Sequence, residues 1–161
     1  MMNKMITASN SVFILMLVLL LLNGCATHSY GNFIQNPSTT YSKVMADDVT
    51  AQIVRLYPAA NTQFNLRHVV NDLFGHALIE NLRLAGFAVQ EATQQSIQQQ
   101  IFFAPHQPDT ESQKGLALSY IVDQSGDLYH VKLMIDDMRL SRAFAAQADS
   151  IHPAGLWVRK E

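Results

Sequence analysis

The chain is poor in the residues that staple or activate many small proteins, with one cysteine and one tryptophan. The single cysteine, Cys25, excludes a disulfide within the chain, so the apolar core alone must stabilise the fold. A net charge of −2 and the lack of a basic stripe argue against direct binding to nucleic acid. Ordinary numbers of glycine and proline, seven and five, argue against a wholly disordered chain.

Motifs for catalysis and metal binding are also missing. The histidines include no pair at the i, i+4 spacing of a helical zinc site; they are His28, His68, His76, His106, His130 and His152. There is no Gly-x-Ser-x-Gly elbow, phosphate-binding loop or dinucleotide fingerprint. Asp136 and Asp137 would point to opposite faces of a strand, and Asp123 and Asp127 flank a turn. We therefore expect no metal, no cofactor and no enzymatic activity.

What the chain does have is an apolar run at its start, VFILMLVLLLL over residues 12–22, preceded by Lys4. Its length is typical of a signal peptide and falls short of the roughly 20 residues of a membrane span. The following Leu-Asn-Gly-Cys sequence resembles the lipobox of bacterial lipoproteins. In that class the chain is cut between residues equivalent to Gly24 and Cys25, and the cysteine thiol accepts a diacylglycerol. An uncut signal anchor, or a buried core cysteine, is the alternative.

A lipid on Cys25 would hold the protein at a membrane surface, since each buried methylene contributes about 0.8 kcal/mol. In Gram-negative lipoproteins an aspartate after the cysteine often retains the protein at the inner membrane, so Ala26 favours the outer membrane. We divide the chain into a signal peptide (1–24), a lipidated tether (25–37) and one domain (38–161). Tyr30 and Phe33 in the tether are candidate partner or lipid contacts; the alternative is that they pack on their own domain.

The first half of the domain reads as a helix followed by a βαβ unit. A helix is expected from Ser38 or Thr39 to about Tyr57, where Pro58 ends it. Residues 62–68 alternate as in a strand, and a second helix begins at Asn71 or Asp72. Its end is marked by Gly86, before a short strand over residues 87–91. Strand, helix and strand so close together predict two parallel strands.

The second half predicts a glutamine-rich loop and an antiparallel meander. Residues 92–114 read as a surface loop that contains three consecutive apolar residues, Ile101, Phe102 and Phe103. They form either a short edge strand or a docking point, and Phe102 and Phe103 are candidate partner contacts. Alternating apolar residues over 116–122, 129–135 and 140–144 predict three strands. Trp157 and Val158 form a last short strand or docking tail, and Trp157 is a further candidate contact. The expected fold is a two-layer α+β sandwich, with both helices on one sheet face.

Several segments, taken in order, resemble the TrbH family of conjugal-transfer lipoproteins. They are the lipobox, YGNF (30–33), FNL (64–66), FGHAL (74–78), GFAVQE (86–91), YIVDQSGDLYHVKLMI (120–135), LSRAFAAQ (140–147) and PAGLWVRKE (153–161). The resemblance implies a role in mating-pair formation, within the type IV secretion apparatus that moves plasmid DNA between bacteria. It also implies that the protein tethers or stabilises the outer-membrane part of the core complex.

The expected partners are therefore other core-complex subunits and the membrane, with no direct contact to nucleic acid. The fold also suits domains that form rings in envelope machines, so a ring-like homo-oligomer is a further expectation. Two alternatives remain at this point. One is a pilotin or assembly lipoprotein of another envelope machine, and the other is an envelope-bound cell-wall enzyme.

Overall fold

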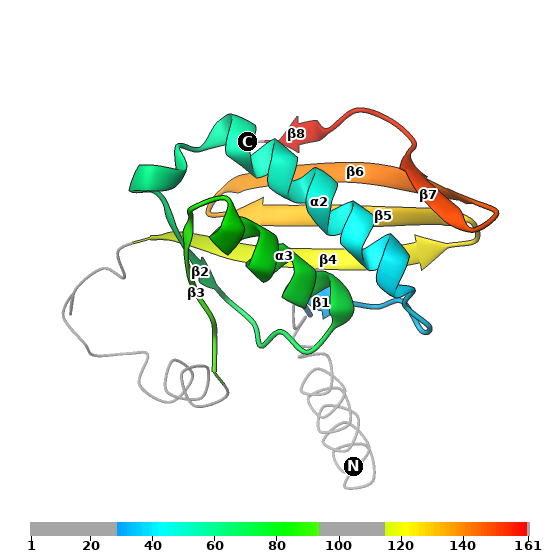
Figure 1. Ribbon diagram of the computed structural model, residues 1–161, viewed down its shortest axis with the longest axis horizontal. Helices are drawn as coiled ribbons and strands as arrows, with labels where there is room; N and C mark the ends of the chain where they lie inside the picture. The colour runs from blue at the N-terminus through cyan, green and yellow to red at the C-terminus, as the bar shows by residue number, and fades with distance from the viewer. Residues whose placement is uncertain (1–28, 94–114, 161) are drawn as a thin grey trace, which may run out of the picture.

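The computed structural model describes residues 29–93 and 115–160, in which two α-helices lie on one face of an eight-stranded mixed sheet (Figure 1). The sheet order is β3-β2-β4-β5-β6-β7, with β1 also on β4 and β8 also on β6. The strands are β1 (Gly31–Asn32), β2 (Gln63–Leu66), β3 (Ala88–Gln90), β4 (Leu116–Ser125), β5 (Leu128–Ile135), β6 (Met138–Gln147), β7 (Ser150–Pro153) and β8 (Val158–Lys160). The predicted two-layer α+β fold is confirmed.

The first helix, α2 (Thr39–Leu56), follows the predicted capping and apolar pattern. The Ser38 side chain accepts a hydrogen bond from the Tyr41 backbone N–H, which satisfies one of the free donors of the first turn. The buried face of α2 includes Met45, Val49 and Ile53, which recur every four residues and form one apolar stripe. A short 3₁₀ turn, η1 (Ala59–Asn61), follows Pro58 and leads the chain back to the sheet.

The predicted βαβ unit is present as β2, α3 (Leu73–Leu84) and β3, with β2 and β3 parallel. Asp72 caps α3 by accepting a hydrogen bond from the Gly75 N–H at 2.9 Å. At the other end Gly86 has a φ of +90°, and the Phe87 N–H donates to the Leu82 carbonyl at 3.0 Å. This is the left-handed helix stop that glycine makes accessible.

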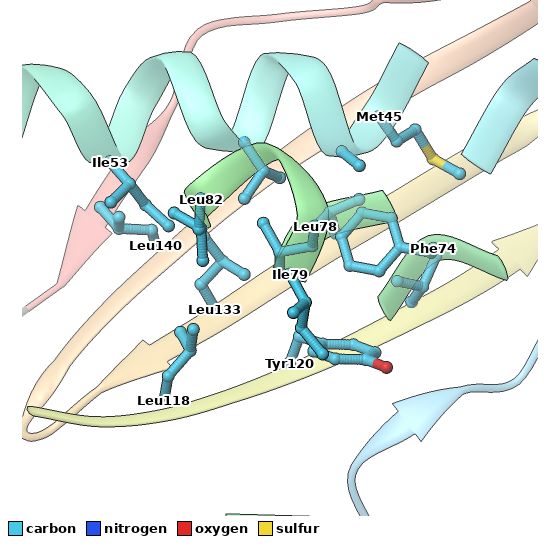
Figure 2. Close-up of a cluster of buried hydrophobic side chains, with 14 of the residues drawn as sticks. Met45, Ile53, Phe74, Leu78, Ile79, Leu82, Leu118, Tyr120, Leu133 and Leu140 are labelled. Carbon is cyan, nitrogen blue, oxygen red and sulfur yellow. The ribbon is translucent and has the colours of Figure 1, made fainter. Parts of the chain in front are cut away.

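The meander β4–β5–β6 is antiparallel as predicted, and alternate side chains on it face the helices. Figure 2 shows the resulting core between the helices and the sheet. Its labelled side chains are Met45, Ile53, Phe74, Leu78, Ile79, Leu82, Leu118, Tyr120, Leu133 and Leu140, all of them buried. The remaining alternate positions of β4, β5, β6 and β8 lie on the sheet face away from the helices.

The structure differs from the expected tether at its C-terminal end. Residues 31 and 32 form β1, which pairs in parallel with Ile121 and Val122 of β4, and Ile34 is buried in the core. A strand of two residues is too short to show a periodic pattern in the sequence. Its pairing is decided by the free edge of β4. Apart from its first two residues, the 92–114 loop, with Phe102 and Phe103, lies outside the described residues, as do Gly24 and Cys25.

Among the described residues, neither helix has the length and apolar character needed to cross a bilayer.

Candidate functional site

Tyr30 lies against a polar and aromatic cluster on its own domain while keeping 36% of its surface exposed. Its ring is 5.9 Å from that of His68, which in turn meets the Tyr120 ring edge-on at 4.5 Å. The Tyr120 hydroxyl donates to Asp72 Oδ2 at 2.5 Å. Asp72 thus caps α3 and also accepts a hydrogen bond from Tyr120 of the sheet. The structure brings Tyr30 to this cluster, and its role as a partner contact stays a prediction.

The surroundings of His68 and Tyr120 favour the neutral form of both side chains. Burial lowers the pKa of His68 below its ordinary value of 6.5, against a smaller raising effect of the nearby Asp72. Burial and the hydrogen bond to Asp72 raise the pKa of Tyr120 well above its ordinary 10.0. Neither ring nitrogen of His68 has a hydrogen-bond partner within the described residues. The cluster therefore fixes β1 and the start of α3 on the sheet.

Phe33 is the second aromatic residue of the expected tether. Its backbone is hydrogen-bonded to the sheet, whereas its side chain is exposed. Its N–H donates to the Val122 carbonyl at 2.8 Å, just beyond β1. The side chain is 51% exposed. Phe33 is thus a fixed apolar group on the surface, a few residues from the candidate lipid site. Its role as a partner contact also stays a prediction.

Trp157 lies in a cluster that ties the end of the chain to α2. Asp48 of α2 accepts two hydrogen bonds from Arg142 Nη1, at 2.8 and 2.9 Å, and one from Trp157 Nε1 at 3.1 Å. Arg142 Nε donates to the Gly155 carbonyl at 2.9 Å, and its guanidinium lies 5.9 Å from the centre of the Trp157 ring. This arrangement holds β8 beside β6, and sequence reasoning missed it because its members are far apart in the chain.

Removing the Asp48 carboxylate should destabilise the domain by about 2–3 kcal/mol. The Arg142 and Asp48 side chains are only 17% and 23% exposed, so Asp48→Ala leaves a half-buried guanidinium without its partner. Chemical unfolding of the purified variant measures the loss. Glu80→Ala, which removes an exposed carboxylate from α3, is the matched control and should change stability by less than about 0.5 kcal/mol. Equal stability of the two variants would contradict this reading of the cluster.

Two of the cavities that open on the surface of the described residues lie against the sheet. One, of about 670 Å³, lies between η1, the starts of β2 and β3, and Leu116; no titratable side chain lines it. The other, of about 460 Å³, lies on the sheet face away from the helices and includes Lys132 and Arg139 in its wall. Within residues 29–93 and 115–160, no group of three histidine, cysteine or acidic side chains is arranged to hold a metal ion.

The described residues thus define a class: a small α+β domain with aromatic and basic surface features. A model of the family described as conjugal transfer protein TrbH matches residues 27–161. The chain belongs to the TrbH family of conjugal transfer proteins. No curated protein and no solved structure matches the chain.

Proposed function

We propose that this protein is an outer-membrane lipoprotein that anchors and stabilises the mating-pair formation complex, the type IV secretion apparatus of plasmid transfer. The observation that carries the proposal is the family match over residues 27–161, which begins two residues after the lipobox cysteine. In this order along the chain, a lipid anchor would be followed directly by the domain that acts in plasmid transfer. Its expected location is the periplasmic side of the outer membrane.

In this proposal Cys25 is the only residue with a defined chemical step, which is its own lipidation after cleavage behind Gly24. Two or more acyl chains make membrane attachment effectively stable. The fold supports such an anchor, because β1 and the buried Ile34 fix the start of the domain only a few residues further along the chain. Because the connection is short, the lipid would hold the domain close to the membrane surface.

The domain would act through contacts with other core-complex subunits. Large apolar side chains exposed on its surface include Phe33 and Leu84, with 51% and 80% of their surface accessible. Such side chains are suited to partner interfaces. The strands β3 and β7 end the main path of the sheet, and edge strands can pair with a neighbouring chain. Pairing of this kind would support a ring-like homo-oligomer.

The direct test of a role in transfer is an in-frame deletion of the gene from its plasmid, followed by a mating assay. We expect transfer to fall to the background of the assay and to return when the wild-type gene is supplied in the donor. Supplying the gene only in the recipient should not restore transfer, because the apparatus is built by the donor. Normal transfer by the deletion plasmid would contradict the proposal and favour a lipoprotein of another envelope machine.

A further inference from the structure

The sheet face away from the helices carries a basic and apolar hollow. Helices α2 and α3 cover the opposite face (Figure 1), and the hollow of about 460 Å³ is open on this one. Three cations line it, Lys132, Arg139 and Lys160. Tyr30, Ile121 and Val158 are among the other residues of its wall, and none of the described lining residues is acidic. We call this site the basic hollow.

Two of its cations face each other, and no acidic side chain among the described residues is paired with either. Arg139 of β6 lies directly opposite Lys160 of β8 in the antiparallel register. Like charges in this position are destabilising. The Lys132 side chain is paired with Asp123 at 2.9 Å, but the side chains of Arg139 and Lys160 make no ion pair or hydrogen bond within the described residues. The geometry is thus one that an anion bound between the two strands would relieve.

Exposed apolar side chains lie beside these charges. Tyr30 and Val158, in the wall of the hollow, have 36% and 61% of their surface accessible, and Leu156 next to β8 has 87%. Cations interleaved with exposed aromatic and aliphatic side chains are typical of surfaces that lie at the headgroup layer of a membrane. A purely acidic protein partner would explain the cations but would leave these apolar groups without a role.

The length of chain before the hollow also points to a membrane. Tyr30 is five residues after Cys25, so even a fully extended chain spans only about 18 Å between them. This step rests on the lipid that the proposed function assigns to Cys25. A lipid there would keep the basic hollow within reach of the headgroups of the same leaflet.

We propose that the basic hollow binds the anionic headgroups of the phospholipid membrane to which the protein is tethered. A phosphate between Arg139 and Lys160 would neutralise the opposed pair, while Tyr30 and Val158 would lie at the boundary of the acyl chains. The sheet face then lies on the membrane, and the helices point away from it toward the partner subunits. The lipid at Cys25 attaches the domain, and the hollow orients it.

The test uses a chain that begins at Ala26 and carries no lipid, so that binding cannot come from the anchor. This chain retains the whole described core, which runs from Ile34 to Ile151. Sedimentation with vesicles of phosphatidylglycerol and phosphatidylethanolamine should show binding that phosphatidylcholine vesicles lack. Arg139→Glu combined with Lys160→Glu should weaken it at least about tenfold. If the reversed pair impairs folding, as a thermal melt will show, the glutamine pair R139Q and K160Q should also weaken it severalfold.

The matched control reverses two exposed cations of α2, Lys43→Glu with Arg55→Glu, at the same change in net charge. It should leave vesicle binding within about twofold of wild type, because those residues lie on the helix layer. Wild-type binding that does not depend on anionic lipid, or equal losses in the two double variants, would overturn the proposal. Loss of an acidic subunit from R139E/K160E complexes, with vesicle binding intact, would assign the hollow to a protein. Failure of the anchor proposal would instead show in lipidation and transfer, which this assay does not use.

Discussion

Replacing Cys25 by serine should leave the precursor uncut and lower plasmid transfer to the level of the gene deletion. Diacylglycerol transfer needs a thiolate nucleophile, and a serine hydroxyl is a much weaker one at neutral pH. Without cleavage and acylation, no lipidated mature domain is produced to be anchored at the outer membrane. Immunoblotting measures the shift to the larger precursor, labelled palmitate measures the lipid, and a mating assay measures transfer.

Two matched variants separate the lipid from its neighbours. Thr27→Ser changes a side chain two residues from Cys25 and should leave processing and transfer unchanged. Ala26→Asp keeps the cysteine, and we expect it to be lipidated but retained at the inner membrane, with lower transfer. A Cys25→Ser protein that is cut, fractionates with the outer membrane and supports normal transfer would exclude the anchor.

Gly75→Ala should destabilise the domain by about 2–3 kcal/mol, which lowers its melting temperature by roughly 10 °C. The sign is opposite to that of an ordinary helix site, where the same change stabilises by about 0.5–1 kcal/mol. A Cβ at Gly75 would overlap the Tyr120 hydroxyl and crowd Val70. Tyr120 must then move, which breaks its hydrogen bond to the helix cap Asp72. Thermal melts monitored by circular dichroism measure the effect.

The control for this substitution is Gly155→Ala, where an added Cβ meets no atom within 4 Å. Its melting temperature should stay within about 2 °C of wild type. Tyr120→Phe added to Gly75→Ala removes the overlapping hydroxyl and should recover part of the loss. Wild-type stability of Gly75→Ala would mean that Tyr120 is not seated against the first turn of α3.

The central elements of the fold could be predicted because each carries its own local signal. Ser38 and Asp72 cap the starts of the two helices, and Gly86 follows the end of the second. Alternating apolar residues mark the strands of the meander. β1 and β7 were missed for the opposite reason, since strands of two and four residues take their structure from a neighbour. Their formation depends on the free edges of β4 and β6.

The surface features could be identified only once the packing of the chain and the pairing of the strands were known. Trp157 was identified as a candidate contact, but its hydrogen bond to Asp48 joins residues 109 positions apart. The opposition of Arg139 and Lys160 likewise comes from the pairing of β6 with β8, which no spacing in the sequence encodes. Tyr30 was predicted as a partner or lipid contact from its polar surroundings alone. The structure adds the cations beside it.

The measurement that tests the proposed function most directly is an affinity purification of the full-length protein, extracted from membranes of plasmid-bearing donors, followed by mass spectrometry. We expect outer-membrane channel and periplasmic subunits of the conjugative secretion system to co-purify, and to be lost from Cys25→Ser cells. A lipidated and folded protein that brings down none of these subunits would contradict the scaffold role. Recovery of subunits from another envelope machine would assign the protein to that machine instead.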